Sequence, residues 1–421
     1  MRLHWAWVVA GVSFIALVGA ASFRAAPGAL IEPLRAEFGW TTGTISLAIS
    51  INLLLYGLTA PFAAALMDRF GVRVVVTYAL TMVAVGSGLT VFMTASWQLV
   101  LLWGVVVGLG TGSMALAFVA TITGRWFVRH RGLVTGVLTA GGAAGQLVFL
   151  PTVAWLSESY GWRPASLVIC IAALAVVPLA AFFLREYPRD VGLLPLGATE
   201  DTPPPPSGGA ARRALTALGS AARTRPFWLL AGGFAICGAS TNGLVGTHFI
   251  PAAHDHGMPT TTAAGLLALV GVFDIVGTIA SGWLTDRVDS RLLLAAYYAL
   301  RGLSLMLLPQ LFGASAHPSM LVFIIFYGLD WVATVPPTVA LCRQYFGMSG
   351  PVVFGWVFAS HQLGAALAAS AAGLTRDHLG SYDLAWYVAG ALCLGAAVLS
   401  ASLARGAEDA PRDLARQGAA G

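Results

Sequence analysis

Lysine is absent from this sequence of 421 residues, and charged residues of all kinds make up only 10% of it. In soluble domains about a quarter of the residues are charged. Hydrophobic residues make up 57% of the chain, which is more than an ordinary soluble core buries. The composition therefore excludes an ordinary soluble protein and indicates a chain that is dissolved in lipid.

Motifs that hold metals, nucleotides or catalytic groups are also missing. The cysteines show neither CxxC nor metal-ligand spacing; they are Cys170, Cys237, Cys342 and Cys393. There is no Walker sequence, so ATP is not expected to be the energy source. No nucleophile–base pattern and no dinucleotide fingerprint is present. We therefore expect no cofactor, no metal and no enzymatic activity.

Long hydrophobic runs, in contrast, recur from end to end of the chain. A helix of about 20 residues, rising ~1.5 Å per residue, crosses the ~30 Å hydrocarbon layer of a bilayer. The hydropathy pattern predicts an all-α polytopic membrane protein with twelve spans. The predicted spans are residues 7–29, 41–64, 74–94, 97–121, 133–156, 165–184, 227–250, 262–284, 292–312, 318–341, 351–374 and 383–404.

The placement of arginine predicts the topology. Only Arg35, Arg163 and Arg376 lie in loops on one side, whereas the opposite loops and both tails are rich in arginine. Positively charged loops stay in the cytoplasm. We therefore expect both termini in the cytoplasm and the chain in the inner membrane. Because the net charge of +5 follows from this topology, no nucleic-acid partner is expected.

Two similar halves are indicated by motifs that recur at a fixed offset. Asp68 follows the second span and Asp286 the eighth, 286 − 68 = 218 residues apart, and Arg125 and Arg343 show the same offset (343 − 125 = 218). Equal offsets indicate two six-helix repeats. We predict an N-terminal bundle over residues 1–184, a Pro- and Gly-rich cytoplasmic linker over 185–225, a C-terminal bundle over 226–404 and a cytoplasmic tail over 405–421.

The repeated motif resembles a known family signature. G-x-x-x-D-R-x-G-x-R, after the second span, is typical of the major facilitator superfamily; Ala64 replaces its first glycine here, and Gly282 fills that position in the weaker second copy. The resemblance implies a monomeric alternating-access carrier in which two six-helix bundles rock about a central site.

A narrower resemblance is to the monocarboxylate porter family, including its oxalate:formate antiporter branch. It rests on Gly-Arg-Trp-Phe at 124–127 with Arg131, Gly132 and Gly136, on Glu-Phe-Gly-Trp at 37–40, and on Gly-Val-Phe-Asp-Ile at 271–275. The family has an arginine four residues after the aspartate of the eighth span. This chain keeps Asp274 but has Thr278 in the arginine position.

Charged clusters after the second and eighth spans are candidates for a gate. Asp68 and Asp286 can each accept from an arginine or from backbone N–H groups of the neighbouring helix, which would latch the helices in one state of the cycle. A solvated surface cluster is the alternative. The predicted gating residues are Asp68, Arg69, Arg73, Asp286, Arg287, Arg291 and Arg301.

Ionisable residues inside the spans are rare, and a charge at the bilayer centre costs roughly 2.5–3.5 kcal/mol on insertion scales. Arg24 lies near the outer end of the first span, where the monocarboxylate porters carry a cationic residue that attracts the anion. Its guanidinium fork suits a carboxylate. Alternatively, the side chain reaches the lipid headgroups.

Two aspartates inside the second half are candidates for proton coupling. Asp274 and Arg301 are expected at similar depth and therefore to pair, either as a proton-coupled switch or as a static ion pair. Nothing in its own helix neutralises Asp330 except Arg343, about three turns away, so we expect Asp330 to take up and release protons. A structural hydrogen bond of Asp330 is the alternative.

Polar groups in other spans complete the predicted binding site. His361 is expected to bind the solute carboxylate or relay a proton, or else to make an interhelical hydrogen bond. Tyr56, Gln146 and Asn242 are further predicted substrate-binding residues.

We therefore predict a proton-coupled secondary transporter for a small organic anion, a monocarboxylate. An exporter of amphipathic or drug-like compounds is the alternative, and a membrane sensor without transport is a third hypothesis. The partners expected are the solute, protons and the bilayer.

Overall fold

The computed structural model describes residues 4–114, 116–200 and 209–403. Within these ranges twelve helical segments are long and apolar enough to cross a membrane, and a single bridge, between Phe127 and Leu196, is the only sheet-like pairing. The predicted all-α fold with twelve spans is confirmed. In chain order the spans are α1 and α2 (Trp5–Ala25, Pro27–Phe38), α3 (Thr42–Phe70), α4 (Val72–Thr90), α5, η1, α6 and α7 (Ser96–Leu99, Val100–Val107, Gly108–Ser113, Leu116–Trp126), α8 (Arg131–Tyr160), α9 (Trp162–Phe183), α11, η3 and α12 (Arg225–Gly238, Ala239–Val245, Gly246–Asp255), α13 (Thr260–Thr285), α14 and η4 (Ser290–Leu307, Leu308–Leu311), α15 and α16 (Pro318–Asp330, Val335–Phe346), α17 (Gly350–Leu379) and α18 (Asp383–Ala401).

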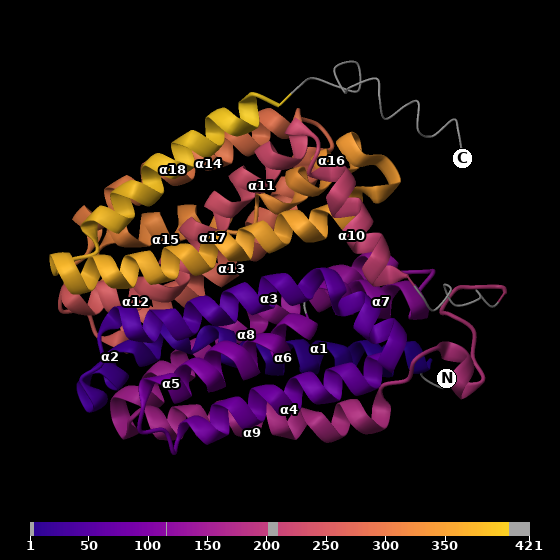
Figure 1. Ribbon diagram of the computed structural model, residues 1–421, viewed down its shortest axis with the longest axis horizontal. Coiled ribbons are helices and arrows are strands. Elements are labelled where there is room, and N and C mark those ends of the chain that lie inside the picture. Colours follow the sequence, from indigo (N-terminus) through magenta and orange to yellow (C-terminus); the bar gives the residue numbers. More distant parts are fainter. Residues whose placement is uncertain (1–3, 115, 201–208, 404–421) are drawn as a thin grey trace.

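The first six spans and the last six form two groups that lie side by side (Figure 1). Between them α3 packs on α17 and α8 packs on α13. The connection contains a short helix, α10 (Ala210–Ala221), which lies against both α3 and α17. Residues 201–208 of the predicted linker and the predicted tail over 405–421 lie outside the described residues.

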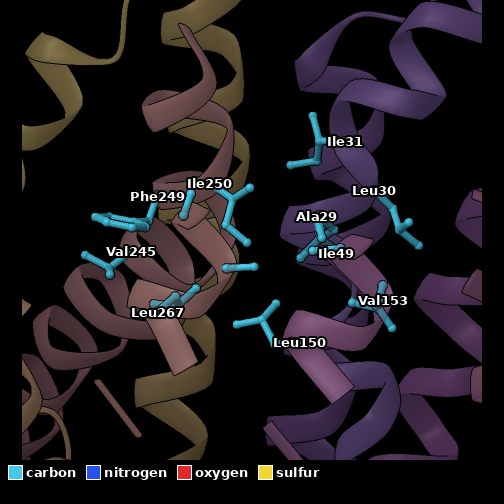
Figure 2. Close-up of a cluster of buried hydrophobic side chains, with 14 of the residues drawn as sticks. Ala29, Leu30, Ile31, Ile49, Leu150, Val153, Val245, Phe249, Ile250 and Leu267 are labelled. Carbon is cyan, nitrogen blue, oxygen red and sulfur yellow. The ribbon is translucent and has the colours of Figure 1, made fainter. Parts of the chain in front are cut away.

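The two ends of the bundle differ in how the halves meet. We call the end where α1 begins and α18 ends the terminal face, and the opposite end the far face (right and left in Figure 1). Toward the far face one apolar cluster spans both halves: Figure 2 shows Ile250 and Leu267 facing Ala29 and Leu150. Toward the terminal face the apolar core is divided into two clusters, one in each half.

Carboxylates seal the far face across the boundary between the halves. Asp377, near the end of α17, accepts from the backbone N–H groups of Thr42 and Gly43 at 2.9 and 2.6 Å. Glu158, near the end of α8, accepts from the N–H of Thr261 at 2.9 Å. Both contacts satisfy donors at a helix N-terminus, where no intrahelical acceptor exists and a negative charge is favoured. Each half thus caps a helix of the other.

The tenth span is interrupted in the membrane, as the sequence Pro336-Pro337 indicates. Helix α15 ends at Asp330, and α16 begins at Val335 after a turn. Proline has no N–H to donate and is tolerated in the first turn of a helix, so a new helix starts here. The freed backbone groups of the turn require partners, which side chains of the second half supply.

Candidate functional site

A central cavity lies between the two halves. Its wall combines apolar side chains with amides and hydroxyls, the composition expected of a small-molecule site. Both halves contribute: the lining residues are Ala21, Phe23, Pro27, Ile49, Asn52, Leu53, Tyr56, Gly142, Gln146 and Leu150 from the first half, and Asn242, Gly246, Thr247, Leu267, Trp331 and Gln362 from the second.

Three predicted substrate-binding residues, Tyr56, Gln146 and Asn242, line this cavity. The side chain of Arg24 lies outside the described residues, although Phe23 and Pro27, which flank it in the sequence, both line the wall. Tyr56, Gln146 and Asn242 belong to three different spans, which the fold brings together at one wall.

Two wall residues, Trp331 and Gln362, were missed as ligand candidates in the sequence. Each directly follows a titratable residue, Asp330 or His361, which was the stronger candidate by its chemistry. A glutamine or tryptophan in an apolar helix is itself a polar signal, because its N–H groups need a partner inside lipid.

A second cavity continues from the first. The two share Ala21, Tyr56 and Gly142 in their walls. The second extends along α1 to Leu17 and along α8 to Leu138, that is, toward the terminal face. Hollow space therefore runs from the centre toward the terminal face, whereas the far face is closed by packing and by the two carboxylate caps.

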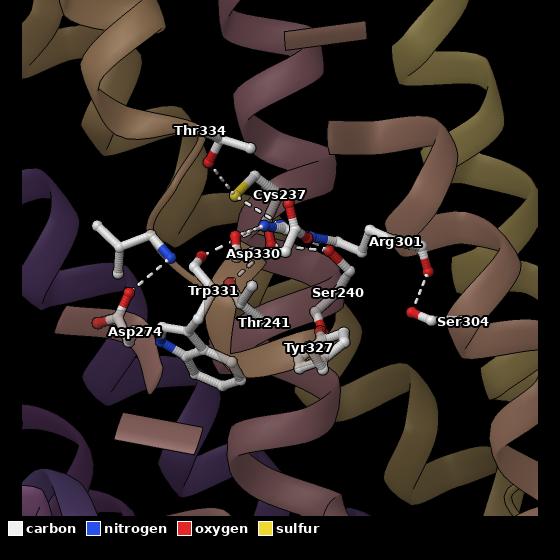
Figure 3. Close-up of polar contacts among 11 residues, drawn as sticks. Cys237, Ser240, Thr241, Asp274, Arg301, Ser304, Tyr327, Asp330, Trp331 and Thr334 are labelled. Carbon is white, nitrogen blue, oxygen red and sulfur yellow. Dashed lines mark hydrogen bonds and ion pairs between the residues drawn. The ribbon is translucent and has the colours of Figure 1, made fainter. Parts of the chain in front are cut away.

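Arg301 pairs with Asp330, so the predicted pairing of Arg301 with Asp274 is wrong (Figure 3). The Arg301 Nε lies 2.5 Å from Oδ2 of Asp330, and both residues are buried. Asp330 is thus neutralised, although not from its own helix: the partner comes from the antiparallel helix α14. Depth alone could not distinguish the two aspartates, since both face the region between α13, α14 and α15.

The same guanidinium also holds the turn between α15 and α16. Arg301 donates to the backbone oxygens of Asp330 and Trp331, at 2.6 and 3.3 Å, and to Sγ of Cys237 at 2.9 Å. The five N–H donors of arginine therefore satisfy both a carboxylate and carbonyls that the helix break leaves open. Removal of Arg301 would leave a buried carboxylate and a broken helix without partners.

Asp274 holds the other side of this turn. Its Oδ1 accepts from the backbone N–H of Val332 and from the hydroxyl of Thr278, each at 3.0 Å. Thr278, which occupies the arginine position of the resembled family, is thus a hydrogen-bond donor to Asp274. The second oxygen, Oδ2, makes no hydrogen bond within the described part of the chain. Asp274 is only partly buried, and its contact residue Val332 is next to Trp331 on the cavity wall.

His361 belongs to α17 in the eleventh span and is buried against the seventh span. It is not among the residues of the cavity wall. Its ring stacks on Phe358, with centroids 5.8 Å apart, and lies 4.8 Å from Phe234. A Cβ at Gly238 would lie 1.8 Å from the carbonyl oxygen of His361, so α11 and α17 touch here. The predicted role of His361 in binding remains a prediction.

A charge network forms after the second span, at the terminal face. Arg125 pairs with Asp68 at 2.8 Å and with Glu186 at 3.2 Å. Glu186 also accepts from the N–H groups of Val72 and Arg73, at 2.7 and 3.0 Å. Asp68 thus accepts from an arginine, as the sequence suggested, while Glu186 caps the neighbouring helix; a latching role of this network remains a prediction. Glu186 was missed in the sequence.

The corresponding site of the second half is not built in the same way. Asp286 and Arg343 are exposed and, within the described residues, form no ion pair. Arg291 pairs instead with Asp289 at 2.6 Å, and Arg287 lies over the Trp283 ring at 4.2 Å. The position 218 residues after Glu186 is Ala404, so the carboxylate that completes the first network has no counterpart in the sequence.

Clusters of three or more metal-binding side chains are absent from the described ranges. The four cysteines form no disulfide.

Comparison with known proteins identifies relatives along almost the whole chain. The sequence model of the Major Facilitator Superfamily matches residues 12–353. Monocarboxylate transporter 13 of Rattus norvegicus is 29% identical over 408 residues, covering 94% of this chain and 88% of that protein. The uncharacterized MFS-type transporter YcxA of Bacillus subtilis is 26% identical over 389 residues, covering 90% of both chains.

Solved structures with the same fold include two of xylose carriers. The partially occluded inward open form of the xylose transporter XylE from E. coli superimposes with a TM-score of 0.70 at 15% identity, covering 96% of this chain and 99% of that one. A D-xylose–proton symporter gives a TM-score of 0.73 at 14% identity, covering 95% and 98%. These likenesses concern the fold.

Proposed function

We propose that this chain, which belongs to the major facilitator superfamily, carries a small organic anion, a monocarboxylate, across the inner membrane together with protons. The observation that carries the proposal is the central cavity, whose wall is built by both halves and holds amides, hydroxyls and an indole. Relatives named monocarboxylate transporters support the choice of solute. Arg24, flanked in sequence by two wall residues, would supply the positive charge.

Alternating access would use the difference between the two faces. The far face is held by Asp377 and Glu158, and hollow space continues from the centre toward the terminal face. With the termini in the cytoplasm, this arrangement would exchange the solute with the cytoplasm. Release of the two caps and closure around the second cavity would expose the centre to the other side.

For proton coupling we propose Asp274 ahead of Asp330. A proton on Asp330 would leave the buried guanidinium of Arg301 without its counter-charge, which is costly. Asp274 is only partly buried, and its Oδ2 has no bonding partner within the described chain. A proton there would weaken the hold of Asp274 on the N–H of Val332, next to the cavity residue Trp331. Protonation could thus change the shape of the cavity.

Uptake into proteoliposomes tests this assignment. Labelled short monocarboxylates are offered with and without an inward proton gradient, using protein with Asp274→Asn, with Asp330→Asn and without substitution. We expect the gradient to accelerate uptake by the unsubstituted protein, and the acceleration to disappear in Asp274→Asn while solute exchange without a gradient persists.

Other outcomes are informative. Loss of the acceleration only in Asp330→Asn would move coupling to the Arg301–Asp330 pair. If carboxylates neither move nor compete while amphipathic or drug-like compounds do, the anion assignment is wrong and the alternative, a carrier of such compounds, takes its place.

A further inference from the structure

Several polar side chains gather on the cavity wall. Within the described residues Gln146, Asn242, Trp331 and Gln362 make no side-chain hydrogen bond. They come from α8, η3, the turn after α15, and α17. The two halves therefore present amide and indole groups from several directions toward the same space.

Gln362 is the most constrained of these residues. Only 2% of its surface is exposed, and its Oε1 is fully buried without a donor in reach. A buried carbonyl oxygen without a donor is costlier than one that is exposed or bonded. Such a group is stable where the occupant of the site supplies the missing hydrogen bond.

The position of Gln362 is fixed by a glycine of the other half. A Cβ at Gly57 would lie 2.4 Å from Cβ of Gln362, so α3 and α17 approach this closely only because residue 57 has no side chain. The close contact restricts the rotamers of Gln362, which lines the cavity.

We propose that Gln362 determines specificity by bonding a hydroxyl group of the solute, and that the solute carries two or more hydroxyl groups in addition to its carboxylate. The carboxylate in this statement rests on the proposed function, but the hydroxyls rest on the wall itself. A hydroxyl both donates and accepts, so it matches either end of an amide. A plain alkyl acid would leave Gln146, Asn242 and Gln362 without partners in a cavity closed around it.

Titration calorimetry on the purified full-length protein tests the assignment. The probes are gluconate, a hydroxylated six-carbon acid, and hexanoate, which has the same chain length without hydroxyls. Gln362→Met keeps the length of the side chain and removes its hydrogen bonds. We expect the unsubstituted protein to bind gluconate at least tenfold more tightly than hexanoate. In Gln362→Met the affinity for gluconate should fall about tenfold, the size of one lost hydrogen bond to a buried group, with hexanoate changed less than twofold.

A second variant protects the test against misfolding. Gln362→Asn keeps an amide but withdraws it by one methylene group, and it should show the same selective loss. Equal weakening of both acids, unchanged binding of gluconate, or preference of the unsubstituted protein for hexanoate would each overturn the proposal.

Failure of the proposed function gives a different result. If neither acid binds but uncharged sorbitol binds the unsubstituted protein and not Gln362→Met, the anion assignment is wrong and the hydroxyl assignment stands. If hexanoate and gluconate bind equally, the anion assignment stands and the hydroxyl assignment is wrong. If none of the three probes binds, both are wrong.

Discussion

Asp377 of α17 binds the backbone N–H of Gly43, the second residue of α3, at 2.6 Å, and thereby joins the two halves at the far face. A Cβ at position 43 would lie 2.9 Å from Oδ2 of Asp377, so a larger residue there would force the carboxylate to shift. Close approach of backbones through small residues is how membrane helices gain packing energy, since lipid is as apolar as the side chains. The Asp377 carboxylate therefore caps helix α3 and also joins the two halves at the far face.

Asp377→Asn is expected to loosen the far face. Loss of a helix cap costs about 0.5–2 kcal/mol, so the ratio of far-face-open to closed molecules should rise several-fold. Labelling by a membrane-impermeant maleimide of a cysteine placed at Thr44, in a variant without native cysteines, measures the change. Asp383→Asn is the matched control, because Asp383 is an exposed aspartate at the same face. Equal labelling in both variants would contradict the seal.

Breaking the Arg301–Asp330 pair should destabilise the protein strongly. Removal of one partner of a buried ion pair costs about 3–5 kcal/mol, because the other charge is left unpaired. We expect Arg301→Met to lower the melting temperature in detergent by many degrees. The double variant Arg301→Met/Asp330→Leu should recover part of the loss. Its incomplete recovery would measure the contacts of Arg301 with the α15–α16 turn, and a double variant less stable than the single one would refute this account.

Arg125→Gln should slow transport, because Arg125 joins Asp68 and Glu186 in the terminal-face network. Without the guanidinium, the two carboxylates repel one another, and the state with the network closed loses stability. Arg343→Gln offers a control at the position 218 residues later, where the arginine is exposed and its loss should change little. Solute exchange rates measured in proteoliposomes compare the two variants with the unsubstituted protein. A larger effect of Arg343→Gln than of Arg125→Gln would contradict the difference between the two halves.

Gly57→Ala should reduce transport at least tenfold, because the added methyl group overlaps Gln362 and keeps α3 and α17 apart. Overpacking of this kind costs about 1–3 kcal/mol. Gly11→Ala is the control, because a Cβ at Gly11 meets nothing within 4 Å; alanine there should be neutral or stabilising by up to ~1 kcal/mol. Solute exchange and melting temperature measured for both variants would separate a local clash from a general effect of replacing glycine.

The sequence itself determined the class of the protein. Length and spacing of the apolar runs predict the spans, since the bilayer sets the helix length, and the offset between Asp68 and Asp286 indicates the repeat. It also identified Tyr56, Gln146 and Asn242 as candidates for the cavity wall, because polar side chains inside a membrane are costly and tend to face a solute pathway.

Only the tertiary structure decided which charges meet. Arg301 reaches Asp330 rather than Asp274, Glu186 completes a network in the first half alone, and Gln362 turns to the cavity while His361 packs behind it. The physical reason is that composition and hydropathy fix the depth of a residue in the membrane. The rotation of each helix about its axis decides which neighbour a side chain contacts. This rotation depends on close packing between helices, for example at Gly57, and therefore cannot be derived from the sequence of one helix alone.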